Sequence, residues 1–175
     1  MDHLLMRRLD LNDLPPMPEL PPGYTLRTYR PDDLEALATL MQAAFEDPKW
    51  TPERLREALI DAPDVKTIFV IDYEGKPVAS ASVRLLPDKY PDSGYVHWVA
   101  CDPAHRGKGL GYAVTLATLY EFVKLGCKDA VLETDDHRLA AIRVYHRLGF
   151  QEEHTAASHL LRWAKIADML AAANL

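Results

Sequence analysis

Residues 99–114 read VACDPAHRGKGLGYAV, and this stretch decides the fold. An apolar run, residues 95–101, ends just before three alternating glycines, and an amphipathic run begins among them. A strand, a glycine turn and a helix in this order aim successive backbone amides at one point, where the helix dipole adds positive potential. Glycines let the backbone approach a phosphate closely, and Arg106 and Lys108 add charge-assisted contacts. The stretch therefore predicts a binding loop for a phosphate-bearing ligand at residues 106–111.

Two common phosphate-binding patterns do not fit this loop. A Walker loop requires Gly-x-x-x-x-Gly-Lys followed by Ser or Thr, and the chain lacks it. A dinucleotide fingerprint requires Gly-x-Gly-x-x-Gly, whereas Gly107, Gly109 and Gly111 stand at alternate positions. The diphosphate of a different coenzyme is the ligand that fits.

A family resemblance rests on two motifs. Residues 106–111 match the Arg-x-x-Gly-x-Gly/Ala signature of the GCN5-related N-acetyltransferase (GNAT) superfamily. Residues 138–150, RLAAIRVYHRLGF, resemble the second motif of that family, and the matching positions are Ala141, Tyr145, Gly149 and Phe150. Either motif alone is weak evidence, but the two in this order and separation are specific. The chain thus resembles a GNAT enzyme over about residues 24–155.

The resemblance implies a fold and a cosubstrate. The implied fold is an α/β (α+β) GNAT fold, with a central mixed, mostly antiparallel sheet that is splayed at the cofactor site and flanked by helices on both faces. The implied cosubstrate is acetyl-coenzyme A, with no metal. Its diphosphate would lie on the backbone amides of Arg106, Gly107, Lys108, Gly109, Leu110 and Gly111. Its pantetheine arm would follow the main chain of Val99 and Cys101.

Tyr145 is the predicted general acid, and the resemblance also places it near the coenzyme sulfur. Acetyl transfer from a thioester to an amine expels a thiolate. A thiol has an ordinary pKa of about 8.5 and a phenol one of about 10. A nearby phenol therefore stays protonated at neutral pH and donates its proton as the thiolate forms. The alternative is that Tyr145 only packs on the sheet.

The sequence leaves the general base open between two side chains and water. His97 lies on the strand before the glycine loop, and strict alternation would place it on the same face as Val99 and Cys101. Imidazole titrates in the range that such a base requires. Asp135, which follows the next strand, is the second candidate, and an ordered water is the third. The alternative is that His97 is a hydrogen-bonded histidine within the sheet and that Asp135 is a helix cap or a loop residue.

Arg138 departs from the family pattern, which often has Asn at this position. Asn caps the helix and bonds toward the pantetheine, and Arg does neither in the same way. We expect Asp135 or Asp136 to cap the helix instead. Arg138 is then free to meet an anionic part of the coenzyme or of the substrate.

The acceptor is the least defined part of the prediction. One helix is predicted to open at Pro31, and a second to start at Thr51, a good N-cap residue. Glu46 and Trp50 lie between these two predicted helices, a region that often helps to form the acceptor pocket in this family. Together with Asp135 they are the predicted substrate contacts; a solvated Glu46 and a packed Trp50 are the alternatives. The formal net charge of -6 suits a cationic amine and argues against nucleic acid, whose phosphates need clustered cations.

We therefore expect acetyl transfer to a primary amine of a small molecule. A protein N-terminus or a lysine is an alternative acceptor, and a longer acyl-coenzyme A is an alternative donor. Acyl-coenzyme A binding without turnover is the remaining reading, because an intact coenzyme loop would look the same in both cases.

The 175 residues suit one domain preceded by an arm. Five prolines between residues 14 and 23 exclude helix and sheet there, so residues 1–23 are predicted as an extended Pro-rich arm and residues 24–175 as a single acetyltransferase domain. The pattern predicts the order β-α-α-β-β-β-α-β-α-β and a terminal amphipathic helix at residues 156–173. The apolar face of that helix would suit a homodimer.

Composition narrows the setting further. Two cysteines make no disulfide framework, and no His or Cys spacing indicates a metal site. No apolar run has the length of a membrane span or of a signal-peptide core, so we expect no membrane partner and a cytoplasmic location.

Overall fold

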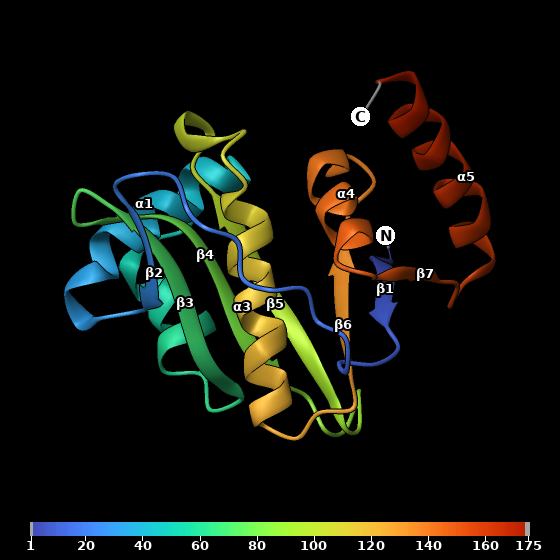
Figure 1. The fold of residues 1–175 in the computed structure, drawn as a ribbon, viewed down its shortest axis with the longest axis horizontal. Helices are drawn as coiled ribbons and strands as arrows, with labels where there is room; N and C mark the ends of the chain where they lie inside the picture. Colours follow the sequence, from blue (N-terminus) through green and yellow to red (C-terminus); the bar gives the residue numbers. More distant parts are fainter. Residues whose placement is uncertain (1, 174–175) are drawn as a thin grey trace.

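A seven-stranded sheet with the strand order β2-β3-β4-β5-β6-β1-β7 forms the centre of the computed structural model, which describes residues 2–173 (Figure 1). Strands β5 and β6 run parallel, and every other neighbouring pair is antiparallel. The mixed, mostly antiparallel sheet implied by the resemblance is confirmed. The strands are β1 (Leu4–Arg8), β2 (Tyr24–Thr28), β3 (Val65–Tyr73), β4 (Lys76–Leu85), β5 (Ser93–Cys101), β6 (Asp129–Thr134) and β7 (Gln151–Glu153).

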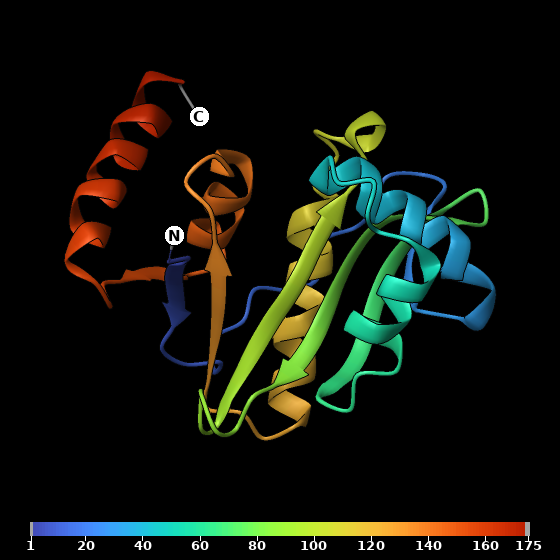
Figure 2. The same ribbon diagram turned by 180° about the vertical axis from the view of Figure 1, so that it is seen from behind.

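Helices cover both faces of the sheet, as expected (Figures 1 and 2). On one face, α3 packs Leu116, Leu119 and Phe122 into the same apolar cluster as Val83 and Val96. On the other face, α1 and α2 form a second cluster with residues of β3 and β5. The helices are α1 (Leu34–Phe45), α2 (Pro52–Leu55), α3 (Leu110–Lys124), α4 (Leu139–Arg147) and α5 (Ala157–Ala172), with short turns η1 (Pro31–Asp33), η2 (Arg56–Ile60) and η3 (Pro103–His105).

The N-terminal segment differs from the single extended arm that the sequence predicts. Strand β1 lies inside the sheet, between β6 and β7, with Leu4 and Met6 fully buried. Only the proline-rich part is extended and irregular; it lies along α3, where the Tyr120 hydroxyl donates to the Pro15 carbonyl oxygen at 2.7 Å. The prolines explain the irregular part, but they say nothing of the residues before them. The sheet therefore begins at Leu4.

Strands β5 and β6 separate after three residue pairs, the last of which is Tyr95 with Val131. On its other side β5 stays paired with β4, but the register slips: Ser80 faces Ala100, whereas Ser82 faces His97. Two residues of β5, at positions 98 and 99, thus oppose one residue of β4, which is a β-bulge, and Trp98 takes a left-handed φ of 49°. A bulge bends its strand. The opening between β5 and β6 lies beside this bulge.

The terminal helix forms as predicted. Helix α5 buries Trp163 and Ile166 in the cluster that also holds α4 residues, and it leaves Leu160, Leu161 and Met169 exposed. The homodimer expected from this face stays a prediction. Within residues 2–173, no helix has both the length and the apolar character needed to cross a membrane.

One arginine joins the start of α1 to the edge of the sheet. Arg27 on β2 donates to both carboxylate oxygens of Asp33, at 2.7 and 2.9 Å, and to Asp72 on β3 at 2.6 Å. The Arg27 side chain is 13% exposed and that of Asp33 is 6% exposed. The hydrogen bonds from Arg27 lower the pKa of Asp33 although burial opposes them. The guanidinium of Arg27 therefore pairs with both carboxylates and stabilises the charged form of Asp33.

We predict that Arg27→Leu lowers the free energy of unfolding by about 3 kcal/mol, because it leaves two largely buried carboxylates without their cation. Urea unfolding at pH 7 measures this. Arg56→Leu is the matched control, since Arg56 and its partner Asp61 are each more than half exposed and such pairs contribute about 1 kcal/mol or less.

The same pair predicts a dependence on pH. The folded pKa of Asp33 lies below the ordinary 3.8, so its contribution is fully present above that pH and is lost as the pH falls through the folded value. The stability gap between the wild type and Arg27→Leu should narrow below about pH 3.8. A gap that stays constant down to pH 2.5 would contradict the assignment.

Candidate active site

The glycine loop forms an open cradle at the first turn of α3. Gly107 and Gly109 have left-handed φ values of 77° and 73°, and Gly109 is the N-cap of the helix. A Cβ atom built at Gly107, Gly109 or Gly111 would meet nothing within 4 Å, so the space that side chains would fill is open. The first amides of a helix have no acceptor within the helix. The loop thus fits a diphosphate, with the exposed Arg106 and Lys108 beside it.

Hydrogen bonds hold this cradle against the sheet. The Asp102 amide donates to the Val78 carbonyl oxygen of β4 at 2.9 Å, and the Asp102 carboxylate accepts from the Ala104 amide at 2.8 Å. The Tyr24 hydroxyl lies 2.7 Å from His105 Nδ1. Because hydrogen bonds connect this turn to both β2 and β4, the position of the glycine loop that follows it is fixed relative to the sheet.

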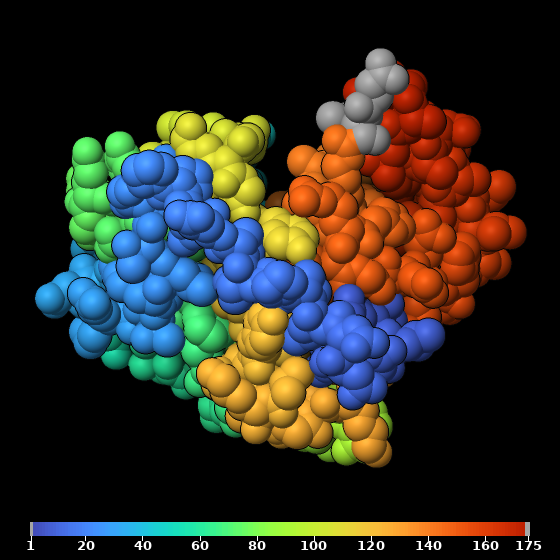
Figure 3. Space-filling view, viewed as in Figure 1, coloured from blue at the N-terminus to red at the C-terminus, as the bar shows by residue number. Residues whose placement is uncertain are grey.

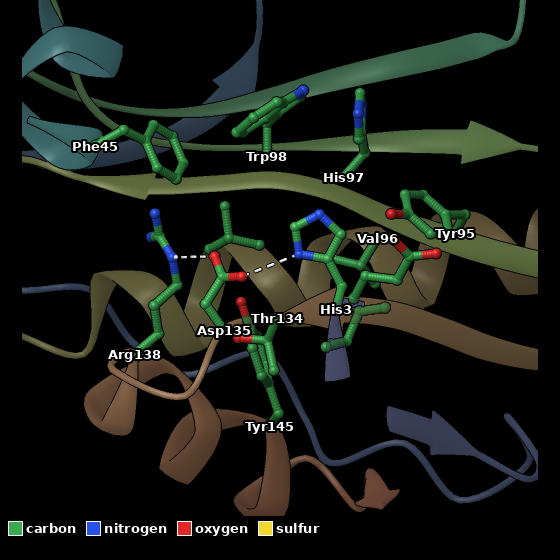
Figure 4. Close-up of a pocket in the computed structure, with 13 residues that line it drawn as sticks. His3, Phe45, Tyr95, Val96, His97, Trp98, Thr134, Asp135, Arg138 and Tyr145 are labelled. Carbon is green, nitrogen blue, oxygen red and sulfur yellow. Dashed lines mark hydrogen bonds and ion pairs between the residues drawn. The ribbon is translucent and has the colours of Figure 1, made fainter. Parts of the chain in front are cut away.

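The opening between β5 and β6 holds a pocket of about 180 Å³ (Figure 3). This volume is below the roughly 300–1,000 Å³ of sites for drug-sized ligands, so the pocket suits reacting groups rather than a whole coenzyme. Beyond Tyr95, the main chain of β5 has no strand partner on the β6 side. The lining residues come from the N-terminal segment, α1, β5, β6 and α4, and they include Val99, Thr134, Asp135, Arg138 and Tyr145 (Figure 4).

Tyr145 projects from α4 into this pocket. Its side chain is buried, and within residues 2–173 its hydroxyl has no hydrogen-bonding partner. Burial raises the pKa of Tyr145 to about 12, against a weak opposing effect of the Arg138 charge. The phenol is therefore protonated throughout the neutral range. The position of Tyr145 near the coenzyme sulfur and its role as an acid stay predictions.

His97 does not share a face with Val99, as strict alternation would require. Val83 packs on the α3 face, so Ser82 and its partner His97 point to the opposite face, whereas Val99 packs toward α3. The bulge at positions 98 and 99 causes the change of phase. Alternation fails here because one additional residue reverses the orientation of every residue beyond it.

The surroundings of His97 also oppose its use as a base. Arg84 Nη1 lies 3.1 Å from His97 Nε2, and a guanidinium only donates, so Nε2 is the acceptor and Nδ1 carries the proton. Burial, with the Arg84 charge, lowers the pKa of His97 to about 4. The imidazole is thus neutral near pH 7, and its one basic lone pair already accepts a hydrogen bond.

Asp135 lies in the pocket between two other side chains, and its roles as substrate contact or base stay predictions. Its carboxylate is 2.9 Å from His3 Nδ1 and 3.5 Å from Arg138 Nε, and the Arg138 guanidinium lies 4.5 Å above the Phe45 ring (Figure 4). The contact between Arg138 and Phe45 joins α4 to α1 across the opening. His3 and Phe45 were not predicted as site residues. The pairing of Leu4 with Thr134 brings His3 to Asp135, and no local pattern signals that pairing.

The structure does not bring Glu46 and Trp50 into the pocket. Trp50 is 1% exposed and packs between Arg54 and Trp98, 4.3 Å and 4.7 Å from its ring centre. Glu46 is exposed at the left-handed C-cap of α1. The neighbouring Phe45 and Trp98 line the pocket in their place, because the helix ends one residue before Glu46.

The predicted aspartate cap of α4 is wrong. Arg138 is the N-cap residue of α4, and no side chain makes a cap hydrogen bond there. Asp136 instead accepts from Arg162 of α5, and Asp135 pairs with His3. Long-range partners therefore take both carboxylates. Arg138 is left with its side chain in the pocket.

Cys101 ends β5 beside the cradle. It is half-buried, and burial raises the pKa of its thiol. Within residues 2–173, no three His, Cys, Asp or Glu side chains gather in a way that would hold a metal ion.

Comparison with known proteins gives the class to which this fold and site belong. The profile of the family described as "Acetyltransferase (GNAT) family" matches residues 34–150. Mycothiol acetyltransferase of Tsukamurella paurometabola is 33% identical over 171 residues, which are 89% of this chain and 59% of that protein. Mycothiol acetyltransferase of Actinosynnema mirum is 34% identical over 157 residues, 84% of this chain and 51% of that protein. The chain spans little more than half the length of these relatives.

Solved structures show the same fold. A GCN5-related N-acetyltransferase from Sphaerobacter thermophilus aligns with a TM-score of 0.66 at 23% identity, over 88% of this chain and 50% of that one. The ribosomal-protein-S18-alanine N-acetyltransferase from Escherichia coli aligns with a TM-score of 0.63 at 26% identity, over 75% of this chain and 79% of that one. The chain belongs to the GNAT acetyltransferase family.

We predict that the ring signals of His97 in an NMR titration stay those of a neutral imidazole down to about pH 4. The reason is that burial disfavours the charged ring and Arg84 adds like charge. The exposed ring of His154 serves as the reference signal in the same spectra. A His97 midpoint between pH 6 and 7 would restore this residue as a candidate base.

Proposed function

We propose that this protein transfers an acetyl group from acetyl-coenzyme A to a primary amine of a small molecule. The observation that carries the proposal is the shared opening between β5 and β6. It has the glycine cradle near one end, and Tyr145 and Asp135 line the pocket within it. Membership of the GNAT family supports the same reaction.

The coenzyme would be held mainly by backbone groups. The amides around Gly107, Gly109 and Gly111 suit its diphosphate, since left-handed glycines at a helix start leave room for close approach. The unpaired edge of β5 at Val99 and Cys101 suits its amide-bearing arm, because that edge still has free hydrogen-bonding groups. When bound, acetyl-coenzyme A supplies an acetyl thioester.

Tyr145 is the general acid in this proposal. A pKa of about 12 keeps the phenol protonated throughout the neutral range, so its proton is available when negative charge develops on the leaving sulfur. Its hydroxyl has no protein partner within residues 2–173, so it is free to donate into the pocket. The buried ring packs on Phe150, with 6.0 Å between ring centres, which fixes its direction.

The pocket favours a small amine as the acceptor. Asp135 and Glu133 give it acidic groups that attract an ammonium ion. The contact of Arg138 with Phe45 bridges α4 and α1, which narrows the opening to a pocket rather than an extended groove. Relatives named mycothiol acetyltransferase support a small-molecule acceptor. A peptide N-terminus is the second candidate, which the likeness to the ribosomal-protein-S18-alanine acetyltransferase favours.

The first prediction concerns coenzyme binding. Calorimetry should show acetyl-coenzyme A bound in the micromolar range, about -8 kcal/mol, and Gly109→Asp should abolish the binding because its carboxylate would face the diphosphate. Gly75→Asp is the matched control: Gly75 also has a left-handed φ, 81°, and open space at its Cβ, but it lies in the turn between β3 and β4. Equal affinity in a folded Gly109→Asp protein would mean that the loop is misassigned.

The second prediction concerns the acid. Tyr145→Phe should lower kcat by about 100-fold or more, while the affinity for acetyl-coenzyme A stays near that of the wild type. Thiol release with a panel of small amines and with short peptides measures turnover and also separates the two acceptor classes. Tyr120→Phe is the control, because Tyr120 lies on α3 outside the pocket lining and its hydroxyl donates to the Pro15 carbonyl oxygen of the N-terminal segment. An unchanged kcat in Tyr145→Phe would exclude an essential acid role.

A further inference from the structure

A histidine outside the region that matches the family reaches the pocket. His3 comes immediately before β1, whereas the family match begins at residue 34. Strand β1 pairs with β6 in a register that places Leu4 opposite Thr134, so the residues next to this pair, His3 and Asp135, also meet. His3 Nδ1 lies 2.9 Å from Asp135 Oδ1, and both residues line the pocket that contains Tyr145.

The partner of His3 determines which ring nitrogen is basic. A carboxylate only accepts, so Nδ1 carries the proton in the hydrogen bond to Asp135, and the lone pair lies on Nε2. Figure 4 shows the second ring nitrogen turned away from Asp135 toward β5, on which His97 and Trp98 lie. The side chain is 59% exposed, so water can carry a proton away from it.

The other basic groups in the pocket are already engaged. His97 Nε2 accepts from Arg84, and the pKa of His97 is about 4. Burial would raise the pKa of Glu133, but the hydrogen bonds from Lys89 and Tyr90 outweigh it and lower that pKa. His3 Nε2 is the basic nitrogen in the pocket that has no hydrogen-bonding partner within residues 2–173.

We propose that His3 is the general base of acetyl transfer and that Asp135 is its positioning residue. This role rests on the proposed function. As the neutral amine attacks the acetyl carbon, a C–N bond forms and His3 Nε2 accepts the proton that the nitrogen loses. The C–S bond breaks, its electron pair leaves with sulfur, and Tyr145 donates its proton to that sulfur. The imidazolium then returns a proton to the Tyr145 phenolate through water, which leaves both side chains as they began.

Charges of both signs face His3 from the elements around it. Asp135 and Glu133 come from β6 and the turn after it, with Lys89 paired to Glu133. Arg138 of α4 is on the far side of Asp135. Arg162 of α5 donates to the Asp2 carbonyl oxygen at 2.6 Å and pairs with Asp136. The remaining titratable groups of the pocket are Tyr95, His97 and Tyr145.

The first test needs no coenzyme and no turnover. Nitrogen-15 NMR of the ligand-free protein reads the imidazole tautomer directly, and His3→Gln assigns the signal. We expect the Nδ1–H tautomer at His3 in the wild type and a shift toward the Nε2–H tautomer, which water favours, in Asp135→Ala. An Nε2–H ring in the wild type would overturn the proposal, because the basic lone pair would then face the carboxylate.

The second test uses the amine acceptor found by the thiol-release screen. His3→Gln should lower kcat/KM about 100-fold without a change in acetyl-coenzyme A affinity. Added imidazole should restore part of the activity of His3→Ala, because it supplies the missing base. His154→Gln, another exposed histidine on the surface, is the control that keeps the wild-type rate.

The outcomes separate the two proposals. A wild type that turns over while His3→Gln keeps the same rate overturns the role of His3 alone. A wild type that transfers no acetyl group to any amine or peptide overturns the proposed function and this role together. Loss of activity in His3→Gln and His3→Ala that imidazole does not restore also overturns the role as a base, since a purely structural effect would produce it.

Discussion

The separation of β5 from β6 is the constraint on which the rest of the structure depends. The two strands pair over only three residues, and beyond Tyr95 each leaves main-chain groups without a strand partner. Such groups are costly to bury unless water or a ligand bonds to them. The bulge at positions 98 and 99 bends β5 while β4 holds its other edge. The sheet thereby keeps its hydrogen bonds on both flanks and opens at one place.

Helix α3 holds the two halves of the opened sheet together. Its residues Leu116, Leu119 and Phe122 share one apolar cluster with Val83 and Val96 on one side of the opening and with Leu132 and Ile142 on the other. The packing at its base is close, because a Cβ atom on Gly94 would lie 2.2 Å from the Phe122 ring. The same helix begins at the glycine cradle, so the element that closes the core also positions the glycine loop (Figure 1).

The pocket keeps groups of similar intrinsic chemistry in different states. Burial keeps the Tyr145 phenol protonated, and burial with Arg84 keeps the His97 imidazole neutral. His3, more than half exposed, is oriented instead by a carboxylate. The two histidines that line this pocket thus differ in hydrogen bonding, because one nitrogen of His97 meets a donor, whereas one nitrogen of His3 meets an acceptor.

The sequence alone predicted most of the elements and the glycine loop, but not strand β1. Periodicity, glycine turns and the Thr51 cap are local signals, and the helices at Leu34–Phe45, Leu110–Lys124 and Ala157–Ala172 follow from them. Asp135, Arg138 and Tyr145 each lie at a fixed distance along the chain from a recognisable strand or helix. All three line the pocket, and their roles stay predictions.

Only the tertiary structure decided which residues meet across the opening. The bulge in β5 depends on its register with β4, so alternation misplaced His97. The insertion of β1 between β6 and β7 brings together His3 and Asp135, which are 132 positions apart. Trp50 is buried outside the pocket because of the way α1 and α2 pack together. Contacts of this kind depend on the pairing of distant segments, whose free energy no short stretch of sequence contains.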